Sequence, residues 1–103
     1  MLDFNNSLVV GIDVHKRSHT AVMVNPFCQV ISSYTFNNST IITTLKQIQE
    51  KAEDKKLIFA LEDVYGNGLK LCQQIKAQGF DVYSVPSNYT ERERQVIQIK
   101  QTF

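Results

Sequence analysis

Residues 8–16 read Leu-Val-Val-Gly-Ile-Asp-Val-His-Lys, an apolar run that carries one carboxylate. Most of its apolar residues are β-branched, and the run is short and closed by polar residues, which is typical of a strand buried on both faces of a sheet. Asp13 lies near the end of the run. Because an isolated buried carboxylate is costly, we expect Asp13 to be paired, hydrogen-bonded or bound to a metal ion. The structural alternative is an Asp that accepts backbone N–H bonds at a turn.

A second stretch is built in the same way. Residues 57–63 read Leu-Ile-Phe-Ala-Leu-Glu-Asp, a short apolar run that also ends in carboxylates. Two buried strands that bring acids to one edge of a sheet form an arrangement that binds divalent cations. Successive side chains on a strand point to opposite faces, so Asp63 would point away from Glu62. We therefore interpret Asp63 as an acid at the entry to a helix.

The composition is that of one globular domain. The chain has 103 residues, of which 43% are hydrophobic and 20% are charged, and this length is enough to bury a single core. The net charge of +1 gives the chain as a whole no strong attraction to nucleic acid or to a membrane surface. No apolar run is long enough to cross a membrane and no signal-peptide pattern opens the chain, so we expect no membrane partner and a cytoplasmic location. Cys28 and Cys72 are far apart and follow no pattern, which predicts two buried, reduced thiols rather than a disulfide.

The first third of the chain reads as three strands. The apolar run predicts a strand over residues 8–15, and the alternation of apolar and polar residues predicts a second over 19–24. The apolar residues after the turn at 25–27 predict a third strand over 28–36, and short polar turns separate the three. Parallel neighbours would need a crossover of a dozen residues or more, so these strands form an antiparallel meander.

The hydrophobic period then becomes that of a helix. It predicts a helix over residues 41–53, with Asn37, Asn38 and Ser39 as candidate N-cap residues. A strand over 57–61 follows. A second helix is predicted over 67–78, with Gly79 at its C′ position, and a last strand over 80–85.

The predicted order of elements is therefore βββαβαβ. Right-handed crossovers favour an α/β fold with a mixed five-stranded sheet in the order 3-2-1-4-5 and helices on both faces. The first and fourth strands are then adjacent and parallel, which places Asp13 and Glu62 side by side at the C-terminal edge of the sheet. We assign this domain to residues 1–86 and expect residues 87–103 to form a polar tail, because that segment is dense in charge and has no core-sized apolar face.

Two carboxylates on neighbouring strands repel each other unless a cation or a proton lies between them. Oxygen ligands suit Mg²⁺ or Mn²⁺, and a pair of such ions clamps the attacking and leaving oxygens of a phosphodiester displacement. Two carboxylates are too few for a pair of ions. After the fifth strand the chain offers only Glu91 and Glu93, in a non-apolar setting. The sequence thus contains half of a metal site.

Three short motifs resemble those of a known family. Gly-Ile-Asp-Val-His-Lys at 11–16, His-Thr-Ala at 19–21 and Leu-Glu-Asp-Val-Tyr-Gly at 61–66 are similar to the N-terminal part of the DEDD-type insertion-sequence transposases, the IS110 family. Residues 85–92 resemble the stretch after the fifth strand of that family, so the resemblance spans about residues 7–95. It implies a catalytic domain similar to the RuvC Holliday-junction resolvase, with an RNase H-like fold.

The resemblance also implies a function and a site. Asp13 matches the first catalytic Asp of the family and Glu62 matches its Glu, so both would be catalytic residues and ligands of Mg²⁺ or Mn²⁺. The last two acids of the family lie in a Lys-[Ser/Thr]-Asp-x-x-Asp-Ala motif, which does not occur before Phe103. We therefore expect an N-terminal fragment that is inactive alone, from a protein that cleaves and transfers DNA strands. The implied partners are DNA and further copies in a homo-oligomer, with a guide RNA as a third candidate.

His15 and Lys16 follow the first acid closely in the chain. Both side chains suit contacts to nucleic-acid phosphate, which makes them candidate nucleic-acid-binding residues. His15 and His19 are four residues apart across a strand turn rather than along a helix, a spacing that does not favour metal ligation.

Two other interpretations stay open at this point. The sugar-kinase and actin-like ATPase fold also begins βββαβαβ with an Asp on its first strand, but Val14 and His15 leave little room for backbone to wrap a phosphate. The other interpretation is a non-catalytic remnant or interaction module with the same RNase H-like fold. The gene sequence after the codon for Phe103 would discriminate an enzyme fragment from a remnant.

Overall fold

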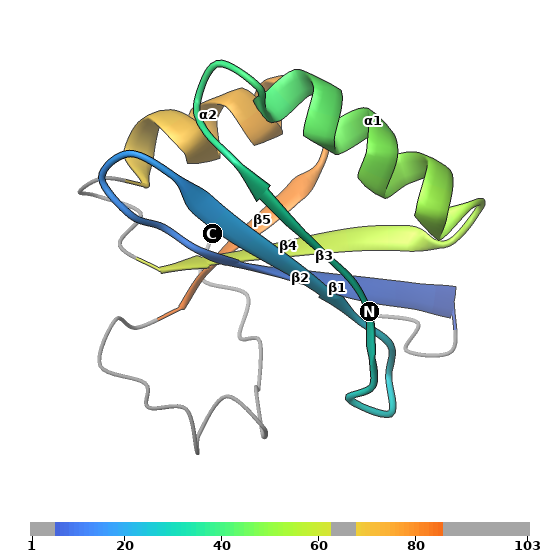
Figure 1. Cartoon of the computed structure of the whole chain (residues 1–103). Helices are drawn as coiled ribbons and strands as arrows, with labels where there is room; N and C mark the ends of the chain where they lie inside the picture. Colours follow the sequence, from blue (N-terminus) through green and yellow to red (C-terminus); the bar gives the residue numbers. More distant parts are fainter. Residues whose placement is uncertain (1–5, 63–67, 86–103) are drawn as a thin grey trace.

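The computed structural model describes residues 6–62 and 68–85, which form a mixed sheet and two helices in the order βββαβαβ (Figure 1). Each predicted element is present, and its bounds differ from the prediction by no more than two residues. The strands are β1 (Ser7–Asp13), β2 (His19–Val24), β3 (Val30–Phe36), β4 (Lys56–Glu62) and β5 (Asp81–Val85), and the helices are α1 (Ile41–Ala52) and α2 (Leu69–Ala77).

The five strands lie in the order β3-β2-β1-β4-β5, which confirms the predicted order. The β1–β2 and β2–β3 pairs are antiparallel, as the short turns require, whereas the β1–β4 and β4–β5 pairs are parallel. The register of the central parallel pair places Gly11 beside Ala60 and Ile12 beside Leu61. The carboxyl ends of β1, β4 and β5 therefore meet at one edge of the sheet.

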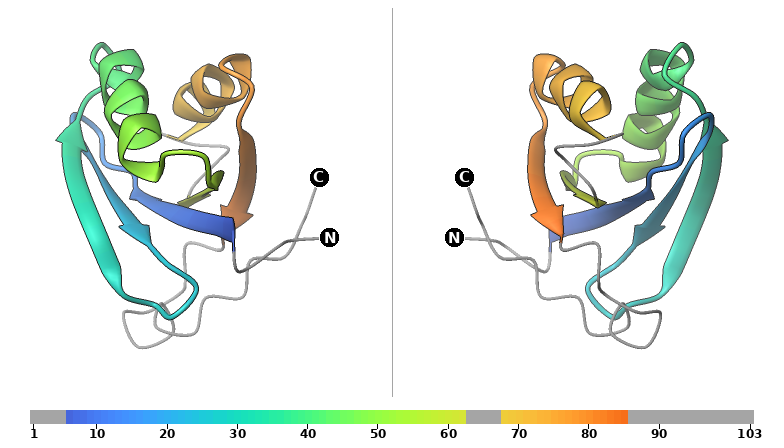
Figure 2. Two further views of the ribbon diagram at one scale, coloured as in Figure 1. Left: turned by 90° about the vertical axis from the view of Figure 1, so that its right-hand side faces the viewer. Right: turned by 90° about the vertical axis from the view of Figure 1, so that its left-hand side faces the viewer.

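Both helices lie on the same face of the sheet (Figure 2), and they contact each other there. This corrects the expectation of helices on both faces. The connections β3–α1–β4 and β4–α2–β5 each join parallel strands, and both proceed across the sheet in the same direction. Two right-handed crossovers in one direction place their helices on the same face.

The hydrophobic core lies between the helices and this face. On β1 the side chains of Leu8, Val10 and Ile12 point to the helices and are at most 3% exposed. They pack in one cluster with the buried faces of α1 and α2, of which Ile48 and Ile75 are examples. Burying a side chain of this size contributes about 1.5–3 kcal/mol, so this cluster supplies the main driving force for folding.

The opposite face of the sheet is less uniformly covered. Val9, Gly11 and Asp13 alternate with the core residues of β1 and are partly exposed, so β1 is buried on one face rather than on two. Ile58 and Ala60 of β4 lie beside Val9 and Gly11 on this open face and are 1% and 4% exposed. β4, rather than β1, is the strand that is buried on both faces.

The ends of the helices follow different local rules. Thr40, at the N-cap of α1, makes no side-chain cap hydrogen bond. Instead the Oδ1 atom of Asn37 accepts hydrogen bonds from the backbone N–H groups of Ser39 and Thr40, at 3.0 and 3.1 Å. The predicted cap residues thus build the turn before α1 and do not cap its free N–H groups. After α2 the predicted C′ residue Gly79 has a φ of 92°, a conformation that glycine adopts without strain.

Other expectations have mixed outcomes. Both cysteines are reduced, as predicted, and Cys72 is buried, but Cys28 is exposed, so the expectation of two buried thiols is wrong for Cys28. No helix among the described residues is long and apolar enough to span a bilayer. The predicted boundary at residue 86, the tail over 87–103 and the orientation of Asp63 lie outside the described residues and stay predictions.

Candidate functional site

Asp13 is the last residue of β1 and Glu62 is the last residue of β4. Because Ile12 lies beside Leu61 in a parallel pair, Asp13 and Glu62 are the next two residues in line. Residues side by side in a parallel pair direct their side chains to the same face of the sheet. Both carboxylates therefore belong to the open face, away from the helices, at the C-terminal edge. Both residues are partly buried there.

Each acid follows a small residue on the same face. Gly11 lies two residues before Asp13 in β1, and Ala60 lies two residues before Glu62 in β4. Gly11 and Ala60 are side by side in the sheet. A Cβ atom added at Gly11 would meet no other atom within 4 Å, so the space above the glycine is open. A small side chain would therefore fit at Gly11, whereas Ala60 beside it is only 4% exposed.

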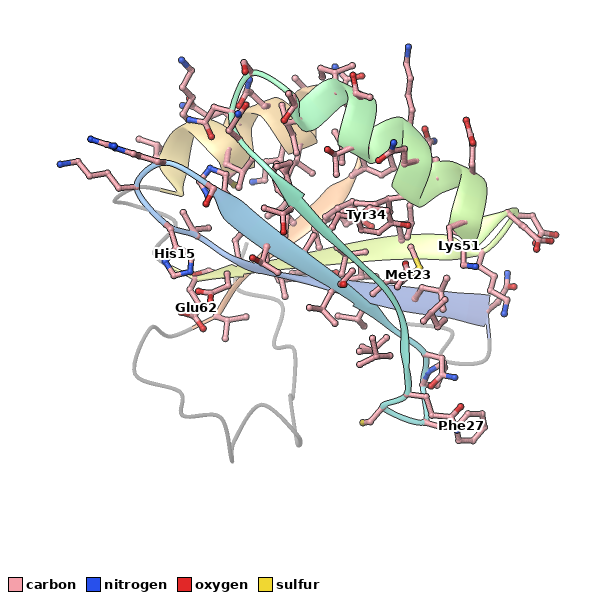
Figure 3. The ribbon with its side chains drawn as sticks, in the orientation of Figure 1. His15, Met23, Phe27, Tyr34, Lys51 and Glu62 are labelled. Atoms are coloured by element: carbon pink, nitrogen blue, oxygen red, sulfur yellow. The ribbon has the colours of Figure 1, made fainter. Side chains whose placement is uncertain are left out.

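The imidazole ring of His15 lies next to the carboxylate of Asp13. Its Nε2 atom lies 3.1 Å from Oδ2 of Asp13, and the two side chains are 60% and 39% exposed. A pair this exposed contributes about 0–1 kcal/mol to stability, so its main effect is local. It places an imidazole N–H donor next to the carboxylate of Asp13. Figure 3 shows His15 and Glu62 at the same end of the sheet.

Lys16 occupies the same turn and is exposed. Its ammonium group adds positive charge at the end of the sheet where the two acids lie. Of the sequence-predicted site residues, the structure thus brings Asp13, Glu62 and His15 to one edge and leaves Lys16 on the adjoining turn.

His19 plays a structural part that the sequence did not reveal. It is 2% exposed and lies on the helix side of β2, because its neighbour Thr20 is the residue that pairs with Asp13. Its Nδ1 atom accepts the backbone N–H of His15 at 3.2 Å. Nδ1 therefore carries no proton, and Nε2 is the nitrogen that donates to Oδ1 of Asn38, at 2.7 Å.

With both ring nitrogens engaged, His19 holds the turn after β1 rather than a metal ion. It ties the backbone of His15 to the loop before α1, and the carbonyl oxygen of Asn38 in turn accepts a hydrogen bond from Gln74 of α2, at 3.4 Å. A weak signal for this role exists in the sequence, because His19 alternates with the buried Ala21 and Met23 on one face of its strand. Its two hydrogen-bond partners could not be inferred from that alternation.

The donor set fits a hard divalent cation in kind. Asp13 and Glu62 supply the carboxylate oxygens that Mg²⁺ and Mn²⁺ prefer, and two such groups on adjacent strands favour a cation between them. Among residues 6–62 and 68–85, however, no group of three or more His, Cys, Asp or Glu side chains is placed to hold a metal ion. The described residues therefore supply part of a coordination shell. Glu91 and Glu93 lie outside the described residues.

Comparison with known proteins identifies the family. The profile of the IS110-type DEDD proteins, described as a transposase, matches residues 10–102, which is nearly the whole chain. Neither a curated protein nor a solved structure gives a significant match. Transposases of this type act on DNA and are typically metal-dependent, and their RNase H-like fold is consistent with the sheet order found here. The chain belongs to the IS110 family of DEDD transposases.

Proposed function

We propose that this chain forms part of the catalytic centre of a transposase that cleaves and transfers DNA strands. In this proposal Asp13 and Glu62 are catalytic residues and ligands of Mg²⁺ or Mn²⁺. The observation that carries the proposal is the register of β1 and β4, which puts the two acids next to each other at the C-terminal edge. A structural Asp at a turn would not need a second carboxylate on the neighbouring strand.

Each part of the site has a separate task in this proposal. A divalent cation, when bound, supplies the positive charge that neutralises a phosphodiester under attack. Asp13 and Glu62 hold that cation at the edge of a rigid sheet.

We assign His15 and Lys16 to contacts with DNA phosphate. Both are exposed and both lie on the turn that follows Asp13. His15 would exchange its hydrogen bond with Asp13 for a phosphate contact when cation and DNA bind, because the cation takes over the charge of the carboxylate. These contacts position the backbone and carry no sequence information.

Two acids do not complete a site for a pair of cations. We therefore propose that this chain of 103 residues does not cleave DNA by itself, and that further acids of a longer transposase complete the centre. The partner implied by the family is DNA, and we place the activity in the cytoplasm, where an insertion sequence meets its DNA. A guide RNA and a homo-oligomer are further proposals that rest on the resemblance of the motifs.

A cleavage assay tests the assignment. A protein that extends this chain through a Lys-[Ser/Thr]-Asp-x-x-Asp-Ala motif should cut DNA carrying the ends of its element in Mg²⁺ or Mn²⁺, whereas the chain of 103 residues should not. Asp13→Ala and Glu62→Ala should each abolish cutting in the longer protein.

Asp81→Asn is the matched control, because Asp81 is an exposed acid at the other end of the parallel strands, 3.2 Å from Nζ of Lys56. That variant should keep full activity. Activity that survives Asp13→Ala would show that the catalytic centre lies elsewhere.

The same observations give less support to an ATPase or to a non-catalytic module. A phosphate-wrapping turn of the ATPase type would need open backbone after Asp13, but His15 folds back onto the Asp13 carboxylate. A non-catalytic module would keep the fold but would show no dependence on Asp13 and Glu62, which is the result that the cleavage assay distinguishes.

A further inference from the structure

His19 is a polar residue at a position that packing alone would fill with an apolar one. It is 2% exposed and lies on the same face of β2 as Ala21 and Met23, which are fully buried. Its ring packs against that of Phe36, with ring centroids 5.4 Å apart, a contact that a phenyl ring could also make. Burying an imidazole is costly unless its nitrogens are hydrogen-bonded. What the histidine adds over an apolar residue is therefore its pair of hydrogen bonds.

The turn between β1 and β2 is closed by a side chain rather than by its own backbone. Within the described part of the chain, the backbone groups of residues 14–18 make no hydrogen bond with one another. In the turn between β2 and β3, by contrast, the N–H of Cys28 donates to the carbonyl oxygen of Asn25, at 3.0 Å. In the first turn the N–H of His15 donates to Nδ1 of His19, at 3.2 Å. The imidazole thus takes the place of a backbone carbonyl.

The other ring nitrogen of His19 anchors this turn to the helix layer. Nε2 of His19 donates to Oδ1 of Asn38 in the loop before α1, at 2.7 Å. The backbone carbonyl of Asn38 accepts a hydrogen bond from Nε2 of Gln74 in α2, at 3.4 Å. Figure 1 shows the turn after β1 and the loop before α1 at the same end of the sheet. The turn is consequently fixed relative to α2 as well as to β2.

His15 is held at two points. Its backbone N–H bonds to His19, and its ring nitrogen Nε2 lies 3.1 Å from Oδ2 of Asp13. In the function proposed above, the ring leaves Asp13 for DNA phosphate when cation and DNA bind. The bond from the backbone of His15 to His19 does not involve the ring of His15, so it is independent of this exchange.

We propose that His19 is a positioning residue for the contact between His15 and DNA phosphate: its Nδ1 atom fixes the backbone of His15, which directs the ring to the edge where Asp13 lies. The inference rests on the proposed function, in which His15 contacts DNA. His19 lies on the helix side of the sheet, opposite the acids, and acts only through His15. A group that is held in place before binding loses less conformational freedom when DNA binds, so the contact is stronger.

Two substitutions separate the hydrogen bonds of His19. The side-chain oxygen of asparagine can occupy the place of Nδ1, and the side-chain nitrogen of glutamine can occupy the place of Nε2. His19→Asn therefore keeps the acceptor for His15 and loses the donor to Asn38, whereas His19→Gln keeps the donor and loses the acceptor. Each variant leaves one former partner unsatisfied, so thermal unfolding should show a similar loss of stability for both. Circular dichroism should show that both are folded.

Amide exchange of His15 in the chain of 103 residues is the first measurement. The N–H of His15 should be protected from exchange with water in the unmodified protein and in His19→Asn. In His19→Gln it should exchange roughly tenfold faster, because its acceptor is gone. A general loss of stability would speed exchange equally in the two variants, and equal exchange would overturn the proposal.

The ¹⁵N spectrum of the His19 ring checks the direction of the same bond. It should show the ring proton on Nε2, since Nδ1 accepts from His15. A proton on Nδ1 would leave no acceptor for His15 and would overturn the proposal.

DNA binding by the longer protein of the cleavage assay is the second measurement, made at one salt concentration. His19→Gln should bind DNA that carries the ends of the element roughly tenfold more weakly than the unmodified protein, the effect of losing one hydrogen bond to a charged group. His19→Asn, the conservative variant, should bind nearly as well as the unmodified protein. In a His15→Ala background the two substitutions should have the same effect, because no imidazole remains to be positioned. A difference that persists in that background would overturn the proposal.

The two measurements distinguish this inference from the proposed function. If His15→Ala alone leaves DNA binding unchanged, the assignment of His15 to phosphate is wrong and the proposal falls with it, although exchange at the His15 amide would still differ between the two variants. If His15→Ala weakens binding but His19→Asn and His19→Gln weaken it equally, the proposed function stands and positioning by His19 is overturned.

Discussion

Gly11→Ala and Gly79→Ala should change the stability of this domain in opposite directions. At both positions a new Cβ atom would meet nothing within 4 Å, so neither substitution creates a clash. The backbone differs, because Gly79 has a φ of 92° and is the only described glycine with a positive φ. Gly11 lies in the regular part of β1. The sign of each effect therefore depends on backbone conformation alone.

The magnitudes follow from the two conformations. Replacing glycine by alanine where the backbone is ordinary stabilises a protein by about 0.4–1 kcal/mol, because the unfolded chain loses conformational freedom. Gly11→Ala should gain this amount. At Gly79 the same gain is opposed by roughly 1–2 kcal/mol for a side chain in the left-handed region, so the net change is a loss of up to about 1.5 kcal/mol.

Thermal and urea unfolding of the three proteins measure these differences. A change of 1 kcal/mol shifts the Tm of a domain of this size by roughly 4–8 °C, so Gly11→Ala should melt higher and Gly79→Ala lower than the unmodified protein. A lower Tm for Gly11→Ala would contradict this prediction, because it would mean that the space above Gly11 is filled.

Three further substitutions test the strain at Glu53, the hydrogen bonds of His19 and the packing of Phe59. Glu53, at the C-terminus of α1, has a φ of 59°, so Glu53→Gly should raise the free energy of unfolding by roughly 1 kcal/mol in urea titrations, and an unchanged midpoint would argue against strain at this position. His19→Phe keeps an aromatic ring beside Phe36 but leaves the backbone N–H of His15 and Oδ1 of Asn38 without their hydrogen-bond partner. It should lower the free energy of unfolding by about 1–3 kcal/mol in the same titration. An unaltered stability would show that water replaces the imidazole. Phe59 is fully buried with its ring 5.2 Å from that of Phe80, so Phe59→Ala should cost about 3–5 kcal/mol, and a cost under 1 kcal/mol would place this residue outside the core.

Local patterns in the sequence were enough to predict the strands, the helices and the order of the sheet. The short turns around β2 could only join antiparallel strands, and the two long connections could only be crossovers. These constraints leave β1 and β4 adjacent and parallel, so the neighbourhood of Asp13 and Glu62 follows from topology. Both helices lie on one face because two right-handed crossovers that proceed in the same direction across the sheet put their helices on the same side, so the expectation of helices on both faces was wrong.

Contacts between distant residues could not be predicted in this way. His19 contacts Asn38 through a hydrogen bond between side chains that are nineteen residues apart, and nothing in either local pattern indicates the other. The burial of Ile58 and Ala60 on the open face likewise depends on how the sheet is covered rather than on the alternation within β4. The sequence could not predict a complete metal site, because two carboxylates supply only part of the coordination shell of a pair of cations.

The site of Mn²⁺ binding in solution shows directly whether Asp13 and Glu62 are metal ligands. Addition of Mn²⁺ to the isotopically labelled chain should broaden the amide NMR signals around Asp13 and Glu62 first, because a paramagnetic ion affects the nearest nuclei most strongly. Asp13→Asn and Glu62→Gln should each abolish this broadening at the same Mn²⁺ concentration, and Asp81→Asn should not. Broadening that centres on other acids, or that persists in both Asp13→Asn and Glu62→Gln, would contradict the assignment of these two residues as the metal ligands.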